Sequence, residues 1–85
     1  MPVDAPPLAA APPDGDVLTA YDRAHFVTYL RLLDADAMGV DWKETAHSVL
    51  SLNLAADVDA ARRVYDAHLT RARWMTRAGY RQLLK

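Results

Sequence analysis

The chain has 85 residues, no cysteine and a formal net charge of -1. This length allows one small domain, which buries only about 60% of the surface that its unfolded chain exposes. Because cysteine is absent, neither disulfides nor thiolate metal sites can stabilise that domain, and the fold depends on helix packing or on a partner. An isoelectric point near 6.2 gives no general attraction to nucleic acid or to a membrane surface.

Nothing in the sequence predicts membrane insertion or export. It contains no run of about 18 apolar residues. The first residues, Met1 to Asp4, lack the basic region and the apolar region of a signal peptide. We therefore expect a cytoplasmic protein that does not bind a membrane.

The N-terminal segment differs in composition from the rest of the chain. All five prolines lie within residues 1–13. Prolines interrupt helices, and this segment has few large apolar side chains to bury. The sequence therefore predicts a disordered Pro/Ala-rich tail over residues 1–16 and a helical domain over residues 17–85.

The first predicted helix runs from about Ala20 to Met38. Thr19 has the residue type of a helix N-cap, and Asp22, three residues later, suits the positive end of a helix. Gly39 is typical of the residue that follows a helix C-terminus.

The second predicted helix begins after Asp41. The spacing from Asp41 to Glu44 is that of a capping box, with aspartate in place of the usual serine or threonine. This helix is predicted to end near Leu50 or Ser51.

The third predicted helix begins between Asp57 and Asp59 and runs to Ala78, with Gly79 ending it. The connection before it, residues 51–58, is about twice as long as the 3–4-residue turn of a standard helix-turn-helix. The sequence therefore predicts an all-α fold, a small three-helix domain. It is either a helix-turn-helix variant with a lengthened turn or a plain bundle, which composition alone slightly favours.

At about 100° per residue, the third predicted helix has two distinct faces. Its core face contains Ala61, Val64, Tyr65, His68, Ala72 and Met75, with Leu69 at the margin. Its solvent face carries Arg62, Arg63, Arg73 and Arg77. This face is either a stripe that contacts phosphates or an ordinary solvated helix face, because Asp66 also lies in it.

The first predicted helix carries two apolar stripes. The stripe that we expect to meet the core contains Phe26, Tyr29, Leu30, Leu33 and Ala37. The second stripe contains Tyr21, His25, Thr28 and Leu32. It is interpreted either as a docking surface for another protein, with Trp74 as an aromatic anchor, or as a sign that this helix is central and buried on two sides.

The sequence contains no pattern typical of catalysis or metal binding. His25, His47 and His68 fall on three different predicted helices, with no cysteine or acidic residue at ligand spacing. His68 lies on the core face and is predicted to be buried and hydrogen-bonded. The three glycines are scattered and form no phosphate-binding loop. We therefore predict no enzyme, no metal site, no cofactor and no small-molecule ligand.

Four stretches together resemble a known family. They are Tyr21–Phe26 (YDRAHF), Tyr29–Ala35 (YLRLLDA), Ala72–Met75 (ARWM) and Gly79–Leu84 (GYRQLL). They resemble a proteobacterial family of domains of unknown function, carried largely on mobile genetic elements, including integrative and conjugative elements whose transfer they regulate under quorum sensing. The resemblance covers about residues 18–84 and implies a helix-turn-helix variant with an extended turn.

The resemblance implies two alternative functions. In longer activators the domain binds DNA through a basic face, whereas stand-alone members are antiactivators that bind the activator in place of its own domain. The net charge, and a proline-rich tail in place of a second domain, favour an antiactivator. We therefore expect the partner to be a transcriptional activator, bound through its N-terminal domain, and DNA binding to be weak or absent. The alternative is a small DNA-binding helix-turn-helix regulator that uses Arg62, Arg63, Arg73 and Arg77.

Overall fold

The computed structural model describes residues 8–9 and 11–83. Its elements in chain order are α1 (Ala20–Ala24), α2 (Phe26–Ala37), α3 (Trp42–Ser48), α4 (Val58–Trp74), a π-helical segment η1 (Met75–Gly79) and α5 (Tyr80–Leu83). These described residues contain no strand, which confirms the predicted all-α class. None of their helices is long and apolar enough to cross a membrane.

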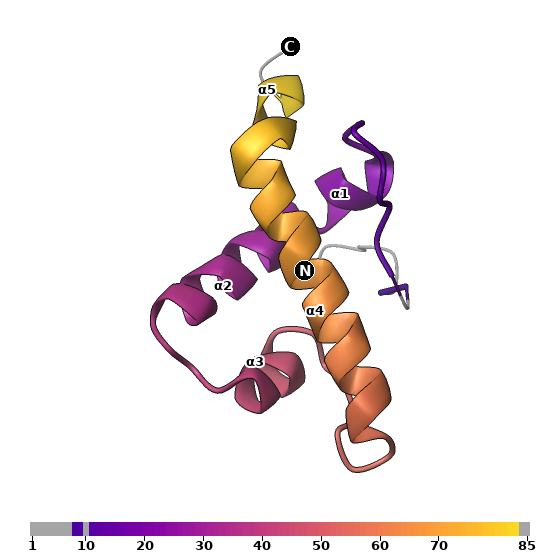
Figure 1. Cartoon of the computed structure of the whole chain (residues 1–85), viewed down its shortest axis with the longest axis vertical. Helices are drawn as coiled ribbons and strands as arrows, with labels where there is room; N and C mark the ends of the chain where they lie inside the picture. The colour runs from indigo at the N-terminus through magenta and orange to yellow at the C-terminus, as the bar shows by residue number, and fades with distance from the viewer. Residues whose placement is uncertain (1–7, 10, 84–85) are drawn as a thin grey trace, which may run out of the picture.

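The long helix α4 is the element against which the others pack. It crosses α2 and contacts α3, as Figure 1 shows. One hydrophobic cluster, between α2, α3 and α4, buries Leu32, Ala46, Leu50, Tyr65 and Leu69. A second cluster, toward the C-terminal end of α4, buries Leu18, Tyr29, Ala72 and Met75. The core face predicted for this helix is confirmed, except that Val64 is only half-buried.

The first predicted helix is divided in two at His25, whose backbone angles (φ -106°, ψ 19°) lie outside the helical region. Its predicted start is confirmed, because Thr19 caps α1 and forms a capping box with Asp22. Its predicted end is also confirmed, because Gly39 follows α2 with a φ of +75°. A positive φ of this kind is readily adopted by glycine.

Of the two interpretations of the second stripe, an exposed docking surface is wrong, and a central helix buried on two sides is confirmed. Leu32 is fully buried and His25 is buried, whereas Leu30, from the predicted core stripe, is 43% exposed. The reason is that α2 packs against α1, α3 and α4, so apolar side chains on two of its sides have neighbours. Periodicity reveals apolar stripes, but it does not reveal which of them meets another element.

The start of α3 directly after Asp41 is confirmed, but the Asp41 side chain makes no capping hydrogen bond, so the predicted capping box is wrong. The α-helix ends at Ser48, slightly earlier than predicted. The chain then turns through Ser51, which has a φ of +56°, while the Leu52 N–H donates to the Ala46 carbonyl at 3.0 Å. This pairing satisfies a carbonyl at the end of the helix.

The connection between α3 and α4 spans residues 49–57. Leu52 and Leu54 in this connection pack against the first hydrophobic cluster. The Asp57 side chain then caps α4 by accepting a hydrogen bond from the Ala60 N–H at 3.0 Å. The predicted fold class, a helix-turn-helix variant with a lengthened turn, is therefore confirmed.

The predicted termination of the third helix at Gly79 is wrong. The chain continues from α4 through η1 into α5 without leaving a helical path. A Cβ atom at Gly79 would lie 2.5 Å from a ring carbon of Trp74. This glycine is therefore explained by the close approach of the indole ring and not by the end of a helix.

Part of the predicted tail lies against the helices. Leu8 packs against the first hydrophobic cluster. The Gln82 amide on α5 donates to the Asp16 carbonyl at 2.8 Å. Composition did not predict these contacts. Residues 1–7 and 10 lie outside the described residues, and disorder over residues 1–16 stays a prediction.

Two leucines of α2 test which side of this helix is buried. Leu32→Ala is expected to lower the free energy of unfolding by about 2–5 kcal/mol, because it leaves a cavity in the core. Leu30→Ala removes the same atoms from a half-exposed site and is expected to cost less than about 1 kcal/mol. Chemical denaturation of both variants measures the difference. Equal losses would contradict the burial of Leu32.

Candidate nucleic-acid interface

The solvent side of α4 and η1 carries four arginines, which we call the arginine face. Arg62, Arg63, Arg73 and Arg77 are all exposed, as predicted. At about 1.5 Å of rise per residue, the first and the last lie roughly 22 Å apart along the helix axis.

Two of these arginines have acidic partners. Arg62 pairs with Asp66 at 3.1 Å, and Arg73 pairs with Asp36 of α2 at 2.8 Å. All four side chains are about half exposed. Exposed ion pairs contribute only about 0–1 kcal/mol, so a stronger anion can displace the aspartates. Arg63 and Arg77 form no ion pair with any described residue.

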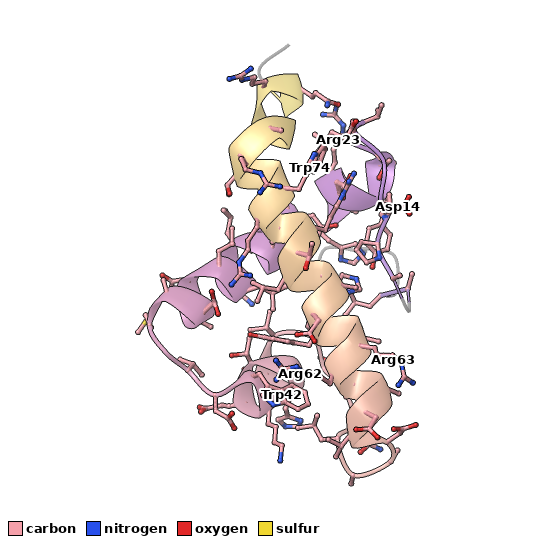
Figure 2. The ribbon with its side chains drawn as sticks, in the orientation of Figure 1. Asp14, Arg23, Trp42, Arg62, Arg63 and Trp74 are labelled. Carbon is pink, nitrogen blue, oxygen red and sulfur yellow. The ribbon has the colours of Figure 1, made fainter. Side chains whose placement is uncertain are left out.

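Arg62 also links α4 to α3. Its guanidinium lies 4.8 Å from the centre of the Trp42 ring and 5.8 Å from that of Tyr65. Figure 2 shows Arg62 and Trp42 together at α3, with Arg63 on the other side of α4. A cation over an aromatic ring gains about 0.5–1 kcal/mol or more. Arg62 is therefore held in place by α3, while Arg63 extends away from it.

The charges of the chain are strongly segregated. Residues 60–85 contain seven arginine or lysine side chains and one acidic side chain, Asp66. Residues 1–59 contain three basic and ten acidic side chains. Although the net charge of the chain is near zero, its C-terminal part is basic. Phosphate binding needs such a segregation of basic residues.

A buried ion pair orients α4 beneath this face. Arg71 donates to the two carboxylate oxygens of Asp22, from Nε at 2.9 Å and from Nη2 at 2.6 Å. Both side chains are almost completely buried. The Tyr29 hydroxyl and the Thr19 N–H also donate to the carboxylate, at 2.8 and 2.9 Å. Asp22 is thus a fully hydrogen-bonded buried charge, as such groups need to be.

The same guanidinium holds the N-terminal segment. Arg71 donates to the carbonyls of Gly15 at 2.6 Å and Val17 at 2.9 Å. It also lies 3.8 Å from the centre of the Trp74 ring. Trp74 is half-buried, packed between this cation, Gly79 and the second hydrophobic cluster.

The pKa values of the residues in this network agree with its geometry. Burial alone would raise the pKa of Asp22, but the hydrogen bonds from Arg71, Thr19 and Tyr29 outweigh it and hold that pKa at about 2. The pKa of Arg71 is raised by its hydrogen bond to Asp22. Burial and the bond to Asp22 raise the pKa of Tyr29, which therefore stays a donor.

The predicted burial and hydrogen bonding of His68 are confirmed. Its Nδ1 lies 2.8 Å from the Val64 carbonyl, which can only accept, so Nδ1 carries the proton. Nε2 then accepts from the Tyr21 hydroxyl at 2.7 Å, and that hydroxyl accepts from the Ala9 N–H at 3.1 Å. Burial lowers the pKa of His68, which favours the neutral ring that this chain of hydrogen bonds requires.

The four residues predicted as a protein-docking surface do not form an open patch. The Tyr21 ring lies against the His25 ring at a tilt, with ring centres 4.4 Å apart, and its hydroxyl is hydrogen-bonded to His68. His25 and Leu32 are buried, and Trp74 is half-buried. The two histidines approach the same tyrosine, which the sequence did not predict. Within the described residues no group of three potential metal ligands is found.

Arg71 is the important residue that sequence reasoning missed. Its neighbours His68 and Ala72 are core residues, which is the signal that its side chain turns inward. The partner, Asp22, is 49 residues away and already serves as a capping residue, so no local pattern connects the two.

An all-helical domain with an extended helix-turn-helix, and exposed arginines on the longer of the two helices, is typical of nucleic-acid-binding regulatory modules. More specifically, the chain belongs to the family described as "T6SS, Transcription factor, DNA binding domain" (RovC_DNA-bd), whose model matches residues 6–85. No curated protein and no solved structure matches the chain.

This family consists of DNA-binding domains of transcription factors and is not a family of enzymes. It indicates DNA as a partner, against the expectation that DNA binding is weak or absent. That expectation relied on net charge and overlooked how the charges are distributed along the chain. The family description makes no reference to antiactivation, mobile elements or quorum sensing, so these stay predictions.

A matched pair of aspartates tests the importance of the buried ion pair. Asp22→Asn leaves Arg71 buried without a counter-charge and is expected to cost about 3–5 kcal/mol of stability. Asp36→Asn breaks the exposed pair with Arg73 and is expected to cost no more than about 1 kcal/mol. Thermal or chemical denaturation compares them, and a small cost for Asp22→Asn would contradict the buried pair.

The pH dependence of stability gives an independent test. The folded-state pKa of Asp22, about 2, lies below its ordinary value of 3.8. The stability that this carboxylate provides is therefore complete above about pH 4 and is lost as pH falls through about 2. At about 1.36 kcal/mol per pKa unit, the loss is on the order of 2 kcal/mol. A carbon-13 NMR titration of the carboxyl group measures the pKa, and a midpoint at or above 3.8 would contradict the network.

Proposed function

We propose that this chain is a DNA-binding regulator of transcription that contacts the phosphate backbone through the arginine face of α4 and η1. The observation that carries the proposal is the exposure of Arg62, Arg63, Arg73 and Arg77 on that face. The chain also belongs to a family of transcription-factor DNA-binding domains. A protein of this kind would act in the cytoplasm.

The geometry suits recognition of a duplex. In helix-turn-helix proteins the second helix enters the major groove and the first crosses the backbone, roles that would fall to α4 and α3. Arginine forms bidentate, charge-assisted hydrogen bonds with phosphate oxygens. Arg63 and Arg77 are available without breaking an ion pair to a described residue. Arg62 and Arg73 would exchange an aspartate for a phosphate at small cost.

The proposal predicts opposite effects for two kinds of substitution on the same face. Arg63→Ala and Arg77→Ala are each expected to weaken binding to a generic duplex. Each should also reduce the steepness of the dependence of log K on log salt by about 0.9, the value for one lost phosphate contact. Asp66→Asn removes a repulsive charge and frees Arg62, so it is expected to strengthen binding. Fluorescence anisotropy at several salt concentrations measures both.

Arg63→Lys is the matched control in this experiment. It keeps the charge and should retain most of the affinity of a phosphate contact, whereas a bidentate hydrogen-bonded contact to guanine would be weakened. Wild-type protein that fails to bind a duplex even at low salt would contradict the proposal. So would arginine variants that bind with unchanged affinity and an unchanged salt dependence.

The second candidate function is that of a QseM-like antiactivator, which binds a transcriptional activator and so represses transfer of a conjugative element. One observation favours it: α2 exposes large apolar side chains that a protein partner would cover. Stoichiometric binding to an activator's N-terminal domain, together with no DNA binding at low salt, would favour this candidate over the first.

A further inference from the structure

The outer side of α2 carries an apolar surface that no described element covers. Five large hydrophobic side chains are exposed in the part of the chain that the structure describes, and three of them lie on α2 or at its C-cap: Val27 (60% exposed), Leu30 (43%) and Met38 (72%). Such clustering is typical of an interaction surface.

Two charged residues complete this surface. At about 100° per residue, Arg31 and Asp34 fall within the same arc as Val27, Leu30 and Met38. Both charged side chains are exposed. Although three residues apart on one helix, they form no ion pair with each other or with another described residue. We call these five residues the α2 outer face.

The pattern of the α2 outer face is self-complementary. If two copies of α2 lie antiparallel across a two-fold axis, the register that places Arg31 opposite Asp34 also places Val27 opposite Met38. By symmetry each pairing occurs twice, and of the five residues Arg31 and Asp34 lie closest to the axis, with Leu30 next to Arg31 on each helix. Two-fold interfaces require a patch of this kind, which is complementary to itself.

From this we infer that the α2 outer face is a homodimer interface, and that its occupant is α2 of a second copy of this chain. Charge complementarity chooses this occupant. One antiparallel register brings both the charged pair and the Val27–Met38 pair together, which an unrelated partner would not require. A single helix pair forms a small interface, so the dimer is weak.

The dimer would leave the DNA-contacting surface free. Figure 1 shows α2 extending to one side of α4, away from α1 and the N-terminal segment. The arginine face belongs to α4 and η1, so self-association through α2 does not cover it. If the proposed function holds, two copies would present two such helices to two half-sites. The self-association itself does not depend on DNA binding.

A charge-swap experiment tests the interface. Arg31→Glu makes both charged positions acidic, and Asp34→Arg makes both basic. Each single variant is expected to self-associate at least about tenfold more weakly than the wild type, because like charges then face each other. An equimolar mixture of the two is expected to form a heterodimer. The double variant Arg31→Glu/Asp34→Arg is expected to self-associate like the wild type.

Sedimentation equilibrium over a wide concentration range measures the wild type, the two single variants, their mixture and the double variant, and circular dichroism confirms that each is folded. A wild type that stays monomeric to millimolar concentration would overturn the inference and leave the surface for a different protein. Single variants that associate as well as the wild type, or a mixture that does not associate, would overturn it too. The samples contain no DNA, so the result does not depend on whether the proposed function is correct.

Discussion

Asp22 and Arg71 stand 49 residues apart in the sequence and form one buried ion pair, and four parts of the chain meet at it. Arg71 comes from α4 and Asp22 from α1, while Tyr29 of α2 and the carbonyls of Gly15 and Val17 complete the network. A buried charge is costly unless it is paired and hydrogen-bonded. This requirement fixes where the N-terminal segment, α1 and α2 lie relative to α4.

The same interaction explains how the arginines come to have different roles. Arg71 is buried with the core side of α4, whereas Arg63 and Arg77 lie on the exposed side of α4 and η1. The acidic residues are concentrated before residue 60. In the described part of the chain, two acidic side chains form ion pairs with the arginine face, Asp66 with Arg62 and Asp36 of α2 with Arg73. A chain with a formal charge of -1 can therefore present a basic surface.

Local chemistry predicted much of the fold. The cap at Thr19, the glycine after α2 and the core face of α4 depend on neighbours in sequence, and all were predicted. The features that were missed depend on distant contacts. Whether Leu32 or Leu30 is buried is decided by where α3 and α4 pack, and the role of Gly79 is decided by the Trp74 ring. For the candidate site, the sequence correctly predicted that the four arginines are exposed, but it did not predict the ion pair that orients them.

The most direct test of the account is an NMR titration of the isotope-labelled chain with a generic DNA duplex at low salt, which follows backbone amides and arginine side chains together. The account predicts that the largest shifts fall on the exposed side of α4 and η1, around Arg63 and Arg77. It also predicts that the α2 outer face, marked by Val27 and Leu30, changes little. Shifts concentrated on α2, or no shifts at all, would contradict the claim that the arginine face binds DNA.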